Sequence, residues 1–443
     1  MNIIYLFEFL KYCLGNEVDM NAVVAKMDWR QLYEFAKKQA LIGFCFEGIE
    51  RLGNEYSEEL RQNPVGQDLL MEWMGKAQQI RRRNMKVNVV AGKLYSQLRK
   101  DGLRCCVLKG QGNALMYPEP YSRTPGDIDV WVNEERSSIT EYAKKHFRLG
   151  DDIRYHHLET SMDGVPVELH FMPGIMNNPV YNARLQKWFK RNADLQCSNV
   201  VSLPDGTGEI AVPTTAFNAI YQLCHMYHHF FDEGIGLRQI IDYYFVVNDF
   251  YKVKENFSKI TPSLFTIKEG STSHPAPLTL RGEGETAPPR CSEPLRSKVG
   301  GPSEVSPECL TQQSCDYLCG VNRLACDTSD ALETLQRELK HLGLFKFAGA
   351  VMYVLHEVLG LSDDKLIVLM DEKRGRLLLS EILNGGNFGK HFSKYGHFTQ
   401  QGMAKKYFLK IWRNMHFVRY YPAEALSEPA FRTWHFLWRM WQK

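Results

Sequence analysis

The stretch Gly126-Asp127-Ile128-Asp129-Val130-Trp131-Val132 decides the fold, because it has the apolar residues of a buried strand and also contains two carboxylates. Side chains alternate between the two faces of a strand, so Asp127 and Asp129 point to one face, about 7 Å apart along the backbone. Two carboxylates near 4 Å in a partly buried site repel by about 4 kcal/mol at an effective dielectric near 20, which favours a bound proton or cation. Mg²⁺ prefers oxygen ligands and often shares them with substrate phosphates. The stretch therefore predicts a site for a divalent metal and a nucleoside triphosphate, although a lone pair of aspartates with this spacing fits a turn cap and a solvated side chain equally well.

Three neighbouring features favour the metal-site interpretation. The segment Leu108-Lys109-Gly110-Gln111-Gly112 places a lysine and flexible amides at a strand-to-helix junction, where backbone N–H groups and the helix dipole attract phosphate. Arg123 can reach phosphate oxygens with its planar guanidinium group. Glu168 adds a third carboxylate on a strand that could be adjacent. Each feature is weak in isolation, since a Lys-Gly turn is usually only a turn and a single charged side chain is usually solvated.

The flanking sequence predicts a small mixed sheet between helical regions. Short apolar or alternating runs give four strand candidates, at 104–108, 128–132, 155–162 and 165–171. Asp163-Gly164 joins the last two, and it predicts a two-residue hairpin because both positions tolerate positive φ. Helical periodicity dominates elsewhere, including one long helix over 67–100. The expected fold class is α+β, a small mixed-sheet core flanked by N-terminal and C-terminal helical regions.

Length and composition divide the 443 residues into more than one compact unit. We expect five regions: a helical region at 1–101, the α/β core at 102–212, a helical region completing the cleft at 213–258, an insertion at 259–330 and a helical region at 331–443. Eight of the 19 prolines lie between Pro262 and Pro307, among Gly, Ser, Thr and Glu. Such a composition cannot bury enough apolar surface to offset its ordering entropy, so we expect the insertion to be disordered.

The overall charge and the termini exclude several classes of protein. A net charge of +3 without a long basic run argues against duplex nucleic acid as a partner. The first ten residues carry Glu8 and lack a cationic start, which argues against a signal peptide, and no apolar run approaches the roughly 18 residues of a membrane span. We expect a cytoplasmic protein.

Six cysteines in apolar or helical settings are expected to be buried free thiols, namely Cys13, Cys45, Cys105, Cys106, Cys197 and Cys224. Structural zinc at Cys315, Cys319 and Cys326 is disfavoured, because they lack paired spacing or a nearby histidine.

Taken in order, these motifs resemble the bacterial nucleotidyltransferase family often labelled uncharacterised, within the polymerase-beta-like superfamily. The residues that carry the resemblance are Leu108-Lys109-Gly110, Tyr117-Pro118, Arg123, Gly126-Asp127-Ile128-Asp129-Val130, Val167-Glu168-Leu169-His170, and the segments 223–230 and 236–242. The resemblance covers roughly residues 100 to 250 and does not extend to the proline-rich stretch. Lys109-Gly110-Gln111 stands where the wider superfamily usually has Gly-Ser, a departure that fits the narrower family.

The resemblance implies an enzyme that moves a nucleoside monophosphate from a nucleoside triphosphate to an acceptor hydroxyl or phosphate and releases pyrophosphate. By position, Asp127, Asp129 and Glu168 would hold two Mg²⁺ (or Mn²⁺) ions, and Glu168 would help deprotonate the acceptor. The groups that would hold the triphosphate are Lys109, Arg123 and the amides of Gly110 and Gly112. The acceptor, the base of the nucleotide and the oligomeric state are not identified.

The histidines and one arginine form a second set of candidates. His225 can share a helix face with His228 or His229, a spacing that suits helix packing, the polar rim of a cleft or a zinc site. Because no metalloprotease pattern is present, we favour packing or a cleft rim over zinc. We interpret His156 and His157 in the same way. The expected cleft residues are His170, which shares a strand face with Glu168, His225 and Arg238. Arg238 and Asp242, four residues apart, are most simply a surface ion pair, with a cleft role implied only by the resemblance.

Two other functions stay open. A glycosyltransferase also uses an Asp-x-Asp pair, but its apolar strand normally precedes the pair, whereas here Val130-Trp131-Val132 follows it. The chain could also be an inactive nucleotide-binding regulator or scaffold. The aromatic and basic segment at 434–441 can anchor at a membrane surface, although an aromatic stripe at helical spacing is more often core or an oligomer contact. Membrane association is therefore not expected.

Overall fold

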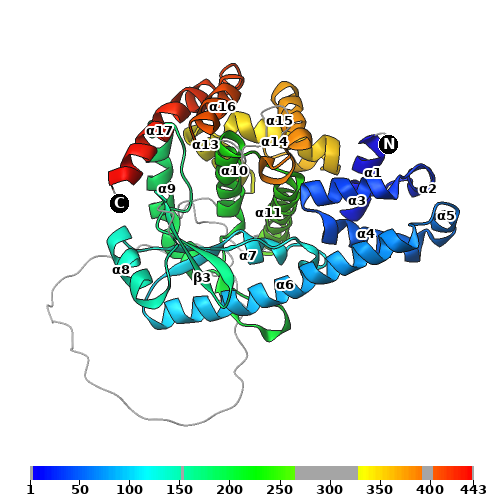
Figure 1. Cartoon of the computed structure of the whole chain (residues 1–443), viewed down its shortest axis with the longest axis horizontal. Coiled ribbons are helices and arrows are strands. Elements are labelled where there is room, and N and C mark those ends of the chain that lie inside the picture. Colours follow the sequence, from blue (N-terminus) through cyan, green and yellow to red (C-terminus); the bar gives the residue numbers. More distant parts are fainter. Residues whose placement is uncertain (1–2, 151–153, 265–327, 392–402, 442–443) are drawn as a thin grey trace, which may run out of the picture.

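The computed structural model describes residues 3–150, 154–264, 328–391 and 403–441, and it confirms the predicted α+β class. Figure 1 shows a small sheet with the N-terminal helices at one end and the later helices packed over it. Helix α11 continues to Leu264 and helix α13 begins at Thr328, so the ends of the predicted insertion at 259–330 are helical. The rest of that insertion, with Cys315, Cys319 and Cys326, lies outside the described residues.

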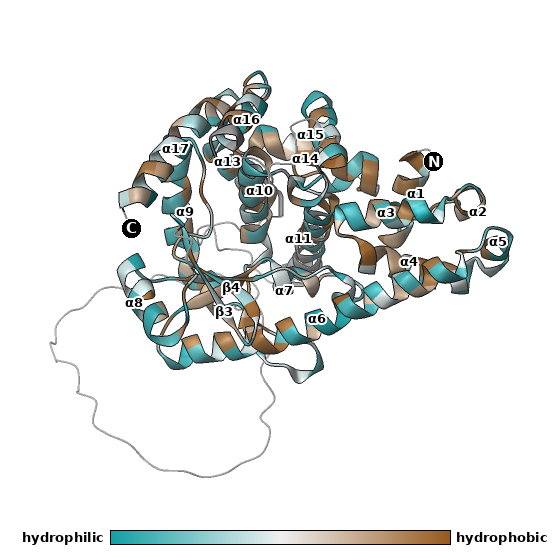
Figure 2. Ribbon diagram, viewed as in Figure 1, coloured by the Kyte–Doolittle hydropathy of each residue, from teal (hydrophilic) through white to brown (hydrophobic). Residues whose placement is uncertain are grey.

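Six helices form the N-terminal region: α1 (Ile3–Cys13), α2 (Met20–Ala25), α3 (Trp29–Gln39), α4 (Ile42–Glu55), α5 (Ser57–Gln62) and α6 (Gln67–Lys100). Helix α6 has the predicted bounds, and its 34 residues span about 51 Å at 1.5 Å per residue. Hydrophobic and hydrophilic segments alternate along it, as the colours of Figure 2 show. Its first half packs on α4, where the Trp73 indole N–H donates to the Ile42 carbonyl (2.9 Å). Its second half lies under the sheet, so α6 joins the N-terminal region to the core (Figure 1).

The core is a four-stranded sheet in the order β1-β2-β4-β3. Its strands are β1 (Cys105–Leu108), β2 (Ile128–Val132), β3 (His157–Met162) and β4 (Val165–His170). The pairs β1/β2 and β3/β4 are antiparallel, and the central pair β2/β4 is parallel. Asp163 and Gly164 have φ values of 50° and 73°, which confirms the predicted hairpin turn. The mixed sheet therefore has the predicted strands, with a parallel pairing at its centre.

The two faces of the sheet join two different hydrophobic clusters. One face, with Val107 and Val130, packs on Leu94 of α6 and on α8 (Arg136–His146). The other face includes Trp131, whose ring stacks on Phe217 with centroids 6.0 Å apart. Phe217 belongs to α10 (Thr215–Asp232), which together with α9 (Pro179–Ser198) covers this face. Because side chains alternate along β2 and β4, Asp129 and Glu168 also point to the α10 face.

Shorter elements complete the core: α7 (Gly110–Ala114), η1 (Pro120–Ser122), and a two-stranded sheet of β5 (Val200–Ser202) and β6 (Glu209–Ala211) around η2 (Pro204–Gly206). The sequence analysis did not identify β5 and β6, because three-residue strands are too short to show a period. Helix α11 (Leu237–Leu264) packs against α10. The six cysteines predicted to be buried free thiols are confirmed as such.

The C-terminal region is helical, as predicted, and consists of α13 (Thr328–His341), α14 (Phe345–Leu359), η3 (Asp363–Lys365), α15 (Glu372–Gly385), η4 (Asn387–Gly389), α16 (Met403–Met415) and α17 (Pro422–Trp441). The buried Glu424 of α17 accepts from the backbone N–H groups of Asn177 (2.5 Å) and Asn178 (3.1 Å), which attaches α17 to the loop after β4. The Trp434 ring packs edge-on against Tyr155 at 4.9 Å, so part of the aromatic stripe makes contacts within the chain. Within the described ranges, every helix is too short or too polar to cross a bilayer.

Candidate active site

The central feature of the site is a row of three carboxylates across neighbouring strands. Asp129 of β2 lies opposite Glu168 of β4, and Glu168 lies opposite Glu159 of β3. Directly paired residues on one sheet face have their Cβ atoms about 5 Å apart, so we name these three residues the carboxylate row. Burial decreases along it, since the side chains of Asp129, Glu168 and Glu159 are 5%, 24% and 38% exposed. The sequence analysis predicted the first two members and missed Glu159.

Two cationic side chains compensate the buried end of the row. Lys109 Nζ lies 2.8 Å from Asp129 Oδ1, and the same ammonium lies 3.3 Å from His225 Nε2. His170 Nε2 lies between two carboxylates, 3.0 Å from Asp129 Oδ1 and 3.1 Å from Glu168 Oε2. Lys109 and His170 therefore contact the carboxylate row, and His225 contacts Lys109.

Their charges shift the proton affinities of the site. Burial opposes ionisation of Asp129, but the Lys109 ammonium and the His170 imidazole hold the pKa of Asp129 well below its usual range. His170 is also buried, yet its bonds to the carboxylates raise its pKa to about 9. The charge of Asp129, with burial and Glu168, raises the pKa of the more exposed Asp127 to about 6. The acidic side chains thus carry more negative charge than the two cations neutralise.

Lys109 adopts an unusual backbone conformation at the end of β1. Its φ is 51° and that of Gly110 is 38°, so two successive residues are left-handed just before α7. No side chain caps the start of this helix, and the first N–H groups of a helix lack intrahelical acceptors. Gly112 is packed closely, since a Cβ there would lie 2.9 Å from Val212 Cγ1. The turn directs the lysine toward the carboxylate row.

Arg123 has a different place from the one that phosphate binding would require. Its Nε and Nη2 donate to Asp242 Oδ1 and Oδ2, both at 2.8 Å, and the two side chains are each 4% exposed. Tyr117 OH donates to the same carboxylate at 2.7 Å. The predicted surface pair of Arg238 and Asp242 is wrong: both are buried, and Asp242 is bound bidentately by Arg123, which arrives from the loop before β2.

Arg238 instead turns toward the strand that carries the aspartates. Its Nη1 donates to the Thr124 carbonyl (3.0 Å) and would lie 4.0 Å from a Cβ placed on Gly126. Burial and the charge of Arg123 lower the pKa of Arg238, and the charges of Asp242 and Asp127 offset this only in part. In the described part of the chain, Arg238 Nε has no hydrogen-bond acceptor. This guanidinium group thus adds a further cation beside Gly126, next to Asp127.

Residues 25–262, more than half of the chain, match the sequence profile of a family described as uncharacterised nucleotidyltransferase. The chain belongs to this nucleotidyltransferase family. No curated protein and no solved structure matches the chain. The matched range extends from the last residue of α2 to Pro262, near the end of α11, so the family includes most of the N-terminal helices as well as the sheet.

The donor set of this nucleotidyltransferase fits a divalent metal. Asp129, Glu168 and His170 each offer a ligand atom within 4.8 Å of the other two. Carboxylate oxygens are the ligands that Mg²⁺ and Mn²⁺ accept, and the excess of negative charge at the row gives a cation a favourable position.

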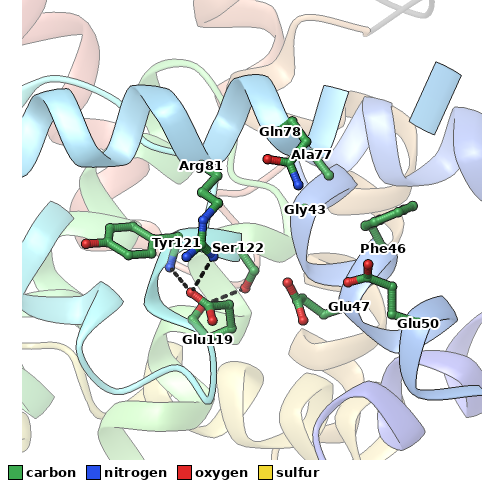
Figure 3. Close-up of a pocket in the computed structure, with 10 residues that line it drawn as sticks. All are labelled: Gly43, Phe46, Glu47, Glu50, Ala77, Gln78, Arg81, Glu119, Tyr121 and Ser122. Atoms are coloured by element: carbon green, nitrogen blue, oxygen red, sulfur yellow. Dashed lines mark hydrogen bonds and ion pairs between the residues drawn. The ribbon is translucent and has the colours of Figure 1, made fainter. Parts of the chain in front are cut away.

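A separate polar pocket lies between α4, α6 and η1, with a volume of about 320 Å³ (Figure 3). Glu47 and Glu50 project from α4, whereas Arg81 of α6 reaches Glu119 at 3.3 Å. Burial and the charges of Glu50 and Glu119 raise the pKa of Glu47. None of its ten lining residues belongs to the carboxylate row or its cations, so this pocket is distinct from the candidate active site.

Proposed function

We propose that this chain is a metal-dependent nucleotidyltransferase of the polymerase-beta-like superfamily, which moves a nucleoside monophosphate from a nucleoside triphosphate to an acceptor and releases pyrophosphate. The observation that carries the proposal is the pairing of Asp129 with Glu168 across the parallel strands β2 and β4, next to Asp127. Family membership supports nucleotidyl transfer in general. The acidic side chains on one sheet face support metal dependence, because they offer carboxylate ligands for divalent ions.

Asp127, Asp129 and Glu168 are the proposed ligands of two Mg²⁺ or Mn²⁺ ions. When bound, these ions would neutralise the triphosphate and lower the pKa of the attacking hydroxyl group. A ligand at Asp129 would compete with Lys109, because the ammonium group contacts the same Oδ1 atom. Lys109 would then be available to a phosphate oxygen.

The triphosphate is proposed to lie between the α7 turn and Arg238. Lys109 and the amides of Gly110 and Gly112 supply donors on one side, in keeping with the resemblance. Arg238 supplies a guanidinium group on the other side, beside Gly126. We assign Arg123 to positioning, because its Nε and Nη2 are committed to Asp242 and its side chain is only 4% exposed.

In the proposed reaction an acceptor oxygen attacks the α-phosphorus atom. A bond forms between these two atoms, the bond from the α-phosphorus to the bridging oxygen breaks, and pyrophosphate leaves. When the acceptor is a hydroxyl group, its proton passes to the Glu168 carboxylate. His170, 3.1 Å from Glu168, holds this carboxylate in place through its Nε2 atom, and His225 contacts the Lys109 ammonium from α10.

The test is incubation with each nucleoside triphosphate labelled at the α-phosphate, Mg²⁺ and a cell extract that supplies acceptors. Asp127→Asn and Asp129→Asn are compared with Asp163→Asn, a matched change in the hairpin turn, where asparagine tolerates positive φ. We expect label transfer by the wild type and Asp163→Asn, and loss in the two site variants. Transfer that survives both site changes would overturn the proposal.

A further inference from the structure

We propose that His156, His157 and His170 form a second metal site, specific for a borderline divalent transition ion such as Zn²⁺ or Co²⁺, on the side of the carboxylate row nearest α10. The sequence analysis favoured packing or a cleft rim for these residues. The site goes beyond the proposed function, since binding of an ion there needs neither nucleotide nor acceptor, and it shares His170 and its neighbour Glu168 with the proposed active site.

The three imidazoles converge from two adjacent strand ends. His157 of β3 lies opposite His170 of β4, and their ring centroids are 4.9 Å apart. His156 immediately precedes β3, and its ring centroid lies 4.4 Å from that of His157 and 5.6 Å from that of His170. One nitrogen of each ring lies within 4.8 Å of the other two. Tetrahedral Zn²⁺ needs ligand nitrogens about 3.3 Å apart, so small side-chain rotations would close the site.

The ring nitrogens of His157 have carboxylates nearby, Glu168 at 3.3 Å and Glu159 at 3.7 Å, but neither contact has the geometry of a hydrogen bond. His157 and His170 are 6% and 3% exposed. In the described part of the chain, no group forms a hydrogen bond with either ring nitrogen of His157 or with Nδ1 of His170. A buried polar atom without a partner costs about 1–3 kcal/mol, and a metal ion would satisfy it.

The surroundings also resemble those of histidine ligands. Glu168 Oε2 lies 3.3 Å from His157 Nδ1 and 3.1 Å from His170 Nε2, and a carboxylate against one ring nitrogen commonly orients a metal-bound histidine. His228 of α10 faces the cluster, with its ring centroid 6.2 Å from that of His156. Its Nδ1 is buried and forms no hydrogen bond with any described residue. His228 is therefore placed to become a fourth ligand.

Three imidazoles select a class of ion. Nitrogen donors favour Zn²⁺, Co²⁺ and Ni²⁺, whereas Mg²⁺ prefers oxygen and keeps much of its water. The carboxylates proposed for catalysis and the imidazoles of the second site would thus hold different ions, and Glu168 would lie between them, against the ring nitrogens of His157 and His170.

The test is a Co²⁺ titration of the full-length protein without nucleotide and with a large excess of Mg²⁺, followed by visible absorption. We expect one Co²⁺ per chain with the bands of a tetrahedral, nitrogen-rich site, retained in Asp127→Asn and in His356→Ala, a control on α14. His156→Ala and His157→Asn should weaken binding at least about tenfold. X-ray absorption of the Zn²⁺-loaded wild type should count three or four histidine nitrogens at about 2.0 Å, a result that needs no variant.

Three outcomes would overturn the second site. They are no Co²⁺ binding to the wild type, unchanged affinity in a natively folded His156→Ala variant, and loss of the bound ion in Asp127→Asn alone, which would place the ion at the aspartates. Label transfer that fails while Co²⁺ binds as expected would count against the proposed enzyme and not against the imidazole site.

Discussion

His170 donates its Nε2 hydrogen toward two carboxylates at once, Asp129 at 3.0 Å and Glu168 at 3.1 Å. The imidazole thereby joins two neighbouring members of the carboxylate row, which come from different strands. Together with Lys109 it keeps the buried end of the row ionised, so the site is prepared to bind cations.

Glu168 is expected to matter more than its neighbour Glu159, although both lie in the same row. Glu168→Gln removes a proposed metal ligand and proton acceptor and should lower the rate of label transfer at least about 100-fold. Glu159→Gln is the matched change at the exposed end of the row and should cause a much smaller loss. Equal losses in steady-state rate for the two variants would contradict the assignment of Glu168.

Arg123 is expected to stabilise the fold and not to bind phosphate. Arg123→Ala leaves the buried Asp242 carboxylate without its counter-ion and should lower the free energy of unfolding by about 3–5 kcal/mol. Tyr117→Phe removes only one hydrogen bond to Asp242 and should cost about 1 kcal/mol. Urea denaturation measures both. An Arg123→Ala variant of native stability that loses affinity for nucleotide would show that the guanidinium group serves the ligand instead.

The metal-free protein is expected to lose stability at alkaline pH through His170. Its pKa of about 9 in the folded state lies above the usual 6.5, so its stabilising contribution is complete below pH 6.5 and is lost as the pH rises through 9. The free energy of unfolding in the presence of a chelator should therefore fall between pH 7 and pH 9.5. His170→Gln should flatten this fall. If the free energy of unfolding falls equally with pH in both proteins, groups other than His170 cause the fall.

Stabilisation by Mg²⁺ is expected to increase from pH 5 to pH 7.5. Because the pKa of Asp127 is raised to about 6, this carboxyl group is largely protonated at the lower pH, and protons compete with the metal. In the metal-free protein the same shift lowers stability as the pH rises from about 4 through 6, and Mg²⁺ should reverse that loss. The shift in melting temperature with saturating Mg²⁺ reports the effect. Asp127→Asn should remove its dependence on pH over this range, and a dependence that remains would point to another group.

Local patterns predicted the strands and the long helix because each depends on a short window of sequence. Strand β2 and helix α6 have the predicted bounds, and Asp163-Gly164 forms the predicted turn. That two-residue turn also determines which residues of β3 and β4 are paired. Counting back from it would have placed Glu159 opposite Glu168 and His157 opposite His170.

Contacts between distant segments could not be predicted in this way. Asp242 lies four residues from Arg238, which suggested a helix-surface pair, but Arg123 reaches it from the loop before β2. The parallel pairing of β2 with β4 likewise depends on the path of the chain between them, which the hydrophobic periodicity within each strand does not indicate. The sequence therefore predicted the candidate ligands, whereas only the structure shows which of them meet.

The most direct test of the account is the number of Mn²⁺ ions that the full-length protein binds together with a non-hydrolysable nucleoside triphosphate analogue. Electron paramagnetic resonance measures free and bound Mn²⁺ in such a titration, and Zn²⁺ added beforehand occupies the imidazole site. The account predicts two Mn²⁺ ions per chain in the wild type and in Asp163→Asn, and loss of at least one in Asp129→Asn and in Glu168→Gln. Two ions in all four proteins would contradict the claim that Asp129 and Glu168 jointly hold the metals against the triphosphate.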